Sequence, residues 1–117
     1  MDINTIREVR KIVKEVGLDE IITTRDFDND IVRRGYTSEE VLNTLRKGFH
    51  CTCEELNIDP KEYASQYYAC GEFVFKDILV GYVLKKDKTL ILIHTGPPTR
   101  NQKLRLKELK KKAKQNS

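Results

Sequence analysis

TTRDFDNDIVRRGYTSEEVLNTLRKG, residues 23–48, is the segment that decides the fold, because it predicts two short helices joined at a glycine. Thr24 is placed to cap the first helix, in which the apolar residues Phe27 and Ile31 lie four positions apart. Gly35 follows as the end of that helix, since glycine adopts the left-handed conformation found at helix C-termini. The first half of the segment therefore predicts one amphipathic helix of about ten residues.

The second half of the segment begins with residues 37–40, Thr-Ser-Glu-Glu, which have the spacing of a capping box. Val41, Leu42 and Leu45 then form an apolar face, and Gly48 is expected to end the helix. Such a helix gains stability by packing its apolar face on another layer. The segment as a whole predicts a capped helix pair that covers a sheet.

The residues before this segment predict a further helix over residues 3–16 and a short link or strand over residues 18–24. The link contributes two residues expected to be buried, Ile21 and Ile22. The apolar face of the N-terminal helix consists of Ile6, Val9, Val13 and Val16, with Ile12 beside it. Both elements are therefore expected to contribute to the same core.

The character of the sequence changes to β-prone from residue 67 onward. Residues 67–76, 78–85 and 89–95 are three such runs, and residues 85–88 have the length of a hairpin connection between the last two. Residues 49–58 are expected to be irregular, and Asp59-Pro60 predicts the start of a helix. We therefore expect an α+β fold, with N-terminal helices packed on a three- to four-stranded antiparallel sheet and a basic C-terminal helix.

Composition restricts the class of protein further. The chain has 117 residues, 38% of them hydrophobic and 34% charged, which indicates one globular domain. No apolar run approaches the roughly 20 residues that span a bilayer, and the N-terminus lacks the apolar core of a secretory signal. With three cysteines and no export signal, reduced thiols and a cytoplasmic location are expected.

The net charge of +4 is distributed unevenly along the chain. Residues 100–117 hold eight basic side chains and one acidic one, whereas residues 1–99 hold 14 basic and 17 acidic ones. The tail has apolar residues at helical spacing and is either a solvated helix or a phosphate-binding helix. Any nucleic-acid attraction is therefore expected to act through the tail or through a local patch.

The combination of a helix ending in glycine, a second helix opening with [ST]-x-E-E-V and an antiparallel meander resembles the RelE/ParE toxin superfamily of small bacterial proteins. It is nearest to the MqsR-like branch and its uncharacterised relatives with a T-x-H…R-G-x-[ST]-x-E-E-V pattern. Where those relatives carry histidine, this chain has Asp26. The matching residues are Thr24, Arg34, Gly35, Tyr36, Ser38, Glu39, Glu40, Val41 and Leu45.

This resemblance implies a single RelE-like domain over residues 1–99, followed by a basic helix or tail over residues 100–117. It also implies that the exposed sheet face holds RNA, free or on the ribosome. Cleavage in such proteins needs no metal, because the ribose 2′-hydroxyl attacks the phosphate with help from basic and tyrosine side chains. An antitoxin protein that silences the toxin is the implied partner, and no cofactor is expected.

For this chemistry the candidate catalytic residues are His94, Tyr82, Lys85 and Arg25. Cleavage requires a group that takes the 2′-hydroxyl proton, and His94 is suited to that because imidazole titrates near neutrality. Tyr82 and Lys85 lie on the preceding strand and its connection, and Arg25 is the first residue of the first helix in residues 23–48. The candidate phosphate-binding residues are Arg100, Lys103, Arg105 and Lys107. In the structural interpretation, His94 and Tyr82 are simply packed at the sheet edge.

Two other functions remain open from the sequence. The first is a non-catalytic protein-binding module on the same fold, which would use the sheet edge or the cysteine-rich loop. The second is a small zinc-stabilised domain with His50, Cys51, Cys53 and Cys70 as ligands, although Cys-x-Cys is tighter than the usual zinc spacing. Buried thiols that pack as small apolar groups account for the same cysteines. Asp26, Asp28 and Asp30 are expected to form a solvated helix surface.

Overall fold

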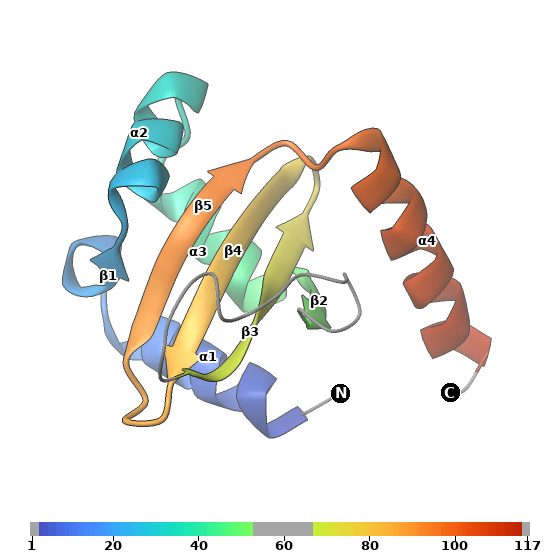
Figure 1. Ribbon diagram of the computed structural model, residues 1–117, viewed down its shortest axis with the longest axis horizontal. Helices are drawn as coiled ribbons and strands as arrows, with labels where there is room; N and C mark the ends of the chain where they lie inside the picture. The colour runs from blue at the N-terminus through green and yellow to red at the C-terminus, as the bar shows by residue number, and fades with distance from the viewer. Residues whose placement is uncertain (1–2, 53–66, 116–117) are drawn as a thin grey trace.

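The computed structural model describes residues 3–52 and 67–115, which form an α+β domain as the sequence predicted (Figure 1). The expected helix from Asp59 lies outside the described residues. The elements are α1 (Ile3–Glu15), the 3-10 helix η1 (Leu18–Glu20), β1 (Ile22–Thr23), α2 (Arg25–Arg34), α3 (Ser38–Lys47), β2 (Phe49–Thr52), β3 (Tyr67–Phe75), β4 (Ile78–Lys85), β5 (Leu90–Gly96) and α4 (Arg100–Gln115).

The sheet has five strands in the order β1-β5-β4-β3-β2, and it is mixed rather than purely antiparallel. β1 pairs with β5 in parallel, whereas the other neighbours are antiparallel. The sheet thus has more strands than the expected three to four. β1 lies in residues 18–24, for which a link or a strand was expected, and β2 comes from residues 49–52, which were expected to be irregular. Because β1 is an edge strand, Ile22 is 54% exposed and the expectation of its burial is wrong, while Ile21 is buried.

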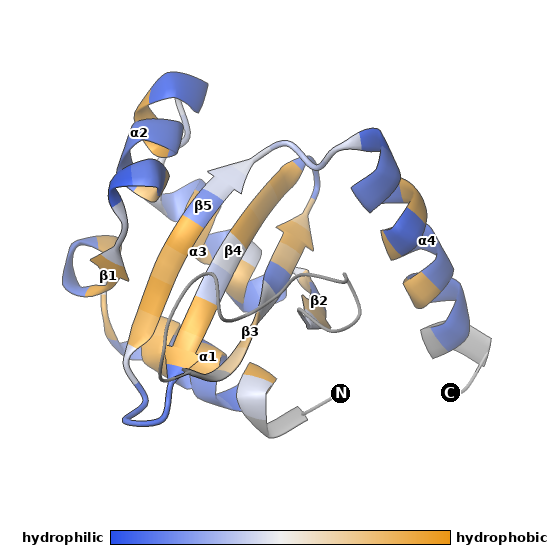
Figure 2. Cartoon of the chain, in the orientation of Figure 1, coloured by the Kyte–Doolittle hydropathy of each residue, from blue (hydrophilic) through white to orange (hydrophobic). Residues whose placement is uncertain are grey.

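Two helices, α1 and α3, cover one face of the sheet, which we call the helix face (Figure 1). The apolar faces expected for these helices meet the strands there (Figure 2). The buried residues of this core are Val9, Val13, Ile21, Phe27, Val41, Leu42, Leu45, Phe73, Val80, Tyr82, Leu84, Leu90 and Leu92. The apolar helix positions that the sequence predicted to be buried are thus the positions that form the core.

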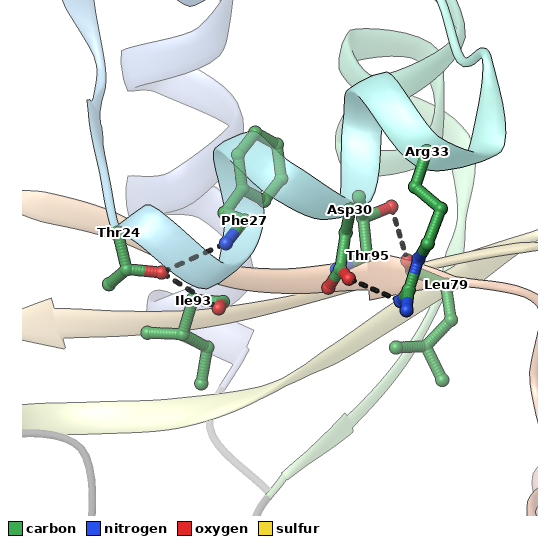
Figure 3. A network of polar contacts seen from close by, with 7 residues as sticks. All are labelled: Thr24, Phe27, Asp30, Arg33, Leu79, Ile93 and Thr95. Atoms are coloured by element: carbon green, nitrogen blue, oxygen red, sulfur yellow. Dashed lines mark hydrogen bonds and ion pairs between the residues drawn. The ribbon is translucent and has the colours of Figure 1, made fainter.

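Helix α2 lies along β5 and is held there by polar contacts at its N-terminus and near its middle (Figure 3). The Thr24 hydroxyl accepts a hydrogen bond from Phe27 N at 3.2 Å, as expected of a cap, and donates to Ile93 O at 2.8 Å. Further along, Asp30 accepts from Thr95 N at 3.4 Å and pairs with Arg33 at 2.7 Å. Asp30 therefore joins helix to strand and is not the solvated side chain that the sequence suggested.

The ends of α2 and α3 follow the signals in the sequence. Gly35 ends α2 with φ of 69°, in the left-handed region where residues other than glycine are strained. Thr37 and Glu40 form both hydrogen bonds of the capping box that opens α3. The expected burial of Val41, Leu42 and Leu45 is confirmed. Local sequence alone therefore specifies where this helix pair begins and ends.

The opposite face of the sheet carries α4 (Figure 1), and we call it the α4 face. Leu106 is 6% exposed and packs with Cys51, Val74 and Leu79 in a second, smaller apolar cluster. The Lys110 ammonium lies 5.4 Å from the ring centroid of Phe49. The thin apolar stripe of the C-terminal helix is thus docked on the sheet, while its cations remain outside.

Among the described cysteines, Cys51 is a buried thiol and Cys70 takes part in a disulfide. The expectation that all thiols are reduced is therefore wrong for Cys70. None of the helices in residues 3–52 and 67–115 combines the length and apolar content that crossing a lipid bilayer requires.

Candidate functional site

The candidate site is a pair of side chains, His94 and Glu72, that meet on the α4 face above the central strand β4. The strand register aligns Cys51, Glu72, Gly81 and His94 in one row across β2, β3, β4 and β5. His94 Nε2 lies 3.3 Å from Glu72 Oε1. The His94 side chain is 32% exposed and that of Glu72 is 4% exposed. A nearly buried carboxylate therefore holds an imidazole that solvent can reach.

A glycine between the two partners makes this contact possible. A β-carbon added to Gly81 would lie 2.4 Å from His94 Cε1, closer than any real contact of that kind. The imidazole therefore lies flat over the Gly81 backbone and reaches Glu72 on the next strand. Any other residue at position 81 would occupy the space that the ring needs.

A β-bulge in β5 turns His94 toward this face. Tyr82 pairs with Leu92 and Gly81 pairs with His94, so Ile93 is an additional residue without a register partner. Leu92 belongs to the helix-face core. In an unbroken strand, residues two apart share a face, and His94 would then point into the core with Leu92. The bulge is therefore what exposes His94.

This arrangement is suited to general acid–base chemistry. A carboxylate that accepts a hydrogen bond from one imidazole nitrogen fixes the orientation of the ring and stabilises its charged form. The sequence pointed to His94 but not to Glu72. The signal available was a glutamate flanked by glycine and phenylalanine inside the apolar run 67–76, because an acid buried in a strand needs a partner.

Tyr82, the second expected catalytic residue, lies on the other side of the sheet. It is 0% exposed in the helix-face core, and its hydroxyl lies 2.5 Å from His50 Nε2. The Phe73 ring packs against both, with centroids 4.8 Å from His50 and 5.4 Å from Tyr82. A β-carbon added to Gly71 would clash first with the Cys51 carbonyl oxygen, and it would lie 3.1 Å from His50 Nε2. Tyr82 therefore does not form one site with His94.

The other two expected catalytic residues also lie apart from the pair. Lys85 ends β4, four residues beyond Gly81 and thus about 13 Å along the strand. Its backbone N–H donates to Thr89 O at 2.9 Å in the hairpin, and its side chain is half-buried. Arg25 is exposed at the start of α2. Of the four expected residues, only His94 occupies the candidate site.

The expected phosphate-binding residues are all on α4, which flanks the row that contains His94. Leu106 docks α4 beside Val74 and Leu79. Each of these two residues lies two positions along its strand from the row, Val74 from Glu72 and Leu79 from Gly81. Arg100, Lys103 and Lys107 are exposed. Arg105 pairs with Glu108 at 3.3 Å, and Lys103 approaches Asp77 at 3.9 Å. The basic helix therefore gives the α4 face a cationic border.

The expected zinc ligands do not share a site. His50 and Cys51 are consecutive on β2 and face opposite sides of the sheet, His50 toward Tyr82 and Cys51 toward Leu106. Cys70 is in a disulfide, and Cys53 lies outside the described residues. Within the described parts of the chain, no group of three or more side chains is placed to hold a metal ion.

The chain was compared with protein-family models, with curated proteins and with solved structures, and none of them matches it. The functional interpretation therefore depends on the geometry of the site.

Proposed function

We propose that this protein binds RNA on the α4 face and cleaves it as a metal-independent, toxin-like endoribonuclease. The observation that carries the proposal is the partly exposed His94 imidazole held across Gly81 by the buried Glu72 carboxylate. The resemblance to RelE-type toxins supports the same sheet face and the same class of chemistry. The adjacent basic helix α4 supplies the positive charge that attracts a phosphate backbone.

In this mechanism His94 acts as the proton-transfer group. It takes the proton of the ribose 2′-hydroxyl, whose oxygen attacks the neighbouring phosphorus. The bond from phosphorus to the 5′-oxygen breaks, and the proton is returned to that leaving oxygen. The products are a 2′,3′-cyclic phosphate and a 5′-hydroxyl end. Glu72 does not touch the RNA but stabilises the protonated imidazole between the two transfers.

The partners and location that go with this function are RNA, free or on the ribosome, an antitoxin protein and the cytoplasm. Because cytoplasmic glutathione keeps most thiols reduced, this location requires that the Cys70 disulfide opens in the cell. Mass-tagging of free thiols after rapid acid quenching of cells measures this directly. A Cys70 thiol that is protected from the tag in quenched cells would contradict the cytoplasmic location.

The direct test is incubation of the purified protein with labelled RNA and with translating ribosomes in the presence of EDTA. Wild type is expected to produce cyclic-phosphate ends, and His94→Ala to lower the rate by about 10²- to 10⁴-fold. Glu72→Gln, which cannot stabilise the imidazolium, is expected to lower it less. No cleavage by the wild type, or equal cleavage by the wild type and His94→Ala, overturns the proposal.

A second candidate is a non-catalytic protein-binding module, and a specific observation favours it. Ile22 on the edge strand β1 is 54% exposed, and Val32 on α2 is 80% exposed. Exposed apolar side chains next to a sheet edge are typical of protein contacts. This function predicts no RNA cleavage and no growth inhibition when the chain is expressed alone, and either effect would exclude it.

A further inference from the structure

The end of β5 brings a second cation to the candidate site. Gly96 is two residues beyond His94, and its partner Leu79 belongs to the α4 face, as does Gly81 opposite His94. A side chain at position 96 would therefore point to the same face as His94, about 7 Å further along the strand. The space that this side chain would occupy is bordered by a guanidinium group.

That guanidinium belongs to Arg34, the last residue of α2. A β-carbon added to Gly96 would lie 3.7 Å from Arg34 Nε and 4.0 Å from one of its terminal nitrogens. Arg34 is exposed, and no ion pair of its side chain is found within residues 3–52 and 67–115. The neighbouring Arg33, in contrast, pairs with Asp30. The charge of Arg33 is therefore engaged by Asp30, whereas the charge of Arg34 can act on a ligand.

The surroundings of Arg34 include further polar groups. Burial raises the pKa of Tyr36, while the Arg34 charge acts in the opposite direction and the carboxylates of Glu40 and Asp77 reinforce the rise. Asp77 is 89% exposed and approaches Lys103 on α4. Arg34 from α2 thus borders the end of β5, and its charge acts on the half-buried Tyr36. Lys103 from α4 lies near Asp77, in the turn between β3 and β4.

We propose that Arg34 binds a phosphate group of the RNA backbone at Gly96, two residues along β5 from His94. A guanidinium presents a planar set of donors that matches two phosphate oxygens, and its charge is permanent. The lack of a side chain at Gly96 leaves room for the phosphate to approach the strand. This proposal rests on the proposed function, because it assigns the cation that holds the substrate beside the proton-transfer group.

Binding is measured first with a fluorescent single-stranded RNA whose 2′-hydroxyls are all methylated, so that cleavage cannot occur. Arg34→Ala is expected to weaken binding by about 10-fold or more, and to make the salt dependence of log K shallower by about 0.7 for the lost phosphate contact. The affinity of Arg34→Lys for this RNA is expected to lie between those of the wild type and Arg34→Ala. Arg33→Ala is the matched control and is expected to bind as the wild type does, since Arg33 is engaged by Asp30.

A second variant guards against an effect of Arg34 on folding. Gly96→Val leaves the arginine in place but puts methyl groups where the guanidinium and phosphate meet, and it is expected to weaken binding to a similar extent. Circular dichroism verifies that both variants are folded. Wild-type affinity and salt slope in Arg34→Ala and Gly96→Val would overturn the phosphate site.

The two proposals fail in different ways. If natural RNA is not cleaved but the methylated RNA binds in an Arg34-dependent way, the catalytic proposal fails and the phosphate site stands. If natural RNA is cleaved equally well by the wild type and Arg34→Ala, the phosphate site fails and catalysis by His94 stands. If the catalytic proposal and the phosphate site are both correct, Arg34→Ala lowers kcat/KM by about 10²-fold, because a donor to the reacting phosphate is lost.

Discussion

At the scale of single residues, two glycines lie next to the rings of two histidines. Gly81 admits the His94 ring on the α4 face, whereas a β-carbon at Gly71 would clash with the Cys51 carbonyl oxygen and would lie 3.1 Å from His50 Nε2. In each case the imidazole crosses the middle of a strand and reaches a polar partner, Glu72 for His94 and Tyr82 for His50. A missing side chain therefore determines the geometry as much as those that are present.

We expect Gly81→Ala to displace the His94 ring, because the new methyl carbon would lie within 2.8 Å of three ring atoms. Overpacking of this kind costs about 1–3 kcal/mol in the free energy of unfolding. Urea unfolding measures the cost, and a two-dimensional NMR spectrum of the imidazole reports the loss of the Glu72 contact. Gly96→Ala is the control for stability, since its methyl would make only ordinary contacts at 3.7 Å. Equal stability of the two variants would contradict the expectation.

Tyr82→Phe removes the hydroxyl that bonds to His50 in the core, and we expect it to destabilise the fold by about 1–3 kcal/mol. Because Tyr82 is 0% exposed, the rate of RNA cleavage per folded molecule should stay at the wild-type value. Chemical unfolding and cleavage assays on the same preparation separate the two effects. A folded Tyr82→Phe protein with a cleavage rate at least 100-fold lower would restore Tyr82 as a catalytic residue.

At the scale of elements, the join between α2 and β5 holds the site together. Thr24 caps α2 and also donates to the carbonyl of Ile93, the bulge residue that turns His94 outward. Asp30 adds a second contact two residues further along the strand, at Thr95 (Figure 3). The helix that carries Arg34 is thereby fixed to the strand that carries His94.

Thr24→Val is expected to cost about 2 kcal/mol in the free energy of unfolding, since it removes a helix cap and a hydrogen bond to a separate strand. Thr37→Val, which removes the α3 cap without breaking a bond to the sheet, is the comparison and should cost about 1 kcal/mol. Urea unfolding of both variants measures the difference. If the two cost the same, the bond to Ile93 does not contribute.

The ion pair between Glu8 of α1 and Lys88 of the β4–β5 hairpin contributes to the stability of the fold in a pH-dependent way. The hydrogen bond from Lys88 is the main cause that lowers the pKa of Glu8 below its usual 4.5, and burial opposes it. A lowered carboxyl pKa adds stability that is complete above about pH 4.5 and is lost as the pH falls through the folded-state value. In Lys88→Met, NMR titration should show the Glu8 pKa raised toward its usual value, whereas the exposed Lys86→Met should leave it lowered. An unchanged Glu8 pKa in Lys88→Met would exclude this cause.

At the scale of the whole molecule, the sheet separates a structural face from a chemical one. The helix face holds the larger core beneath α1 and α3, including the His50–Tyr82 contact. The α4 face holds the His94–Glu72 pair, bordered by a smaller apolar cluster and by a basic helix. The net negative charge of residues 1–99 is compatible with the proposed RNA binding, because the eight basic residues of the C-terminal segment all fall within α4.

Leu106 is the side chain that docks α4, and we expect Leu106→Ala to destabilise the fold by about 2 kcal/mol or more. Leu104, only two residues away and 53% exposed, is the matched control, and Leu104→Ala should change stability by no more than about 0.5 kcal/mol. Urea unfolding compares the two variants. Weaker binding of the methylated RNA by Leu106→Ala would follow from a displaced basic helix. Equal stability of the two variants would mean that α4 is not docked through Leu106.

The sequence by itself determined the elements of this fold. The caps at Thr24 and Thr37, the glycine at 35 and the spacing of apolar residues predicted α1, α2 and α3 closely, and the β-prone runs predicted β3, β4 and β5. These signals are local, since each depends on backbone groups or side chains within a few residues. The sequence left residues 18–24 as either a link or a strand and missed β2, because both strands are short and are defined mainly by their neighbours.

The site was decided only by the tertiary structure. His94 could be identified by its chemistry, but its partner Glu72 is 22 residues away in sequence, and its direction depends on a bulge that strand pairing creates. For the same reason the sequence named Tyr82, which directly follows Gly81, together with His94, and it could not show that the two side chains lie on opposite faces of the sheet. Which side chains meet across strands is fixed by register, and register is a property of the assembled sheet rather than of any one segment.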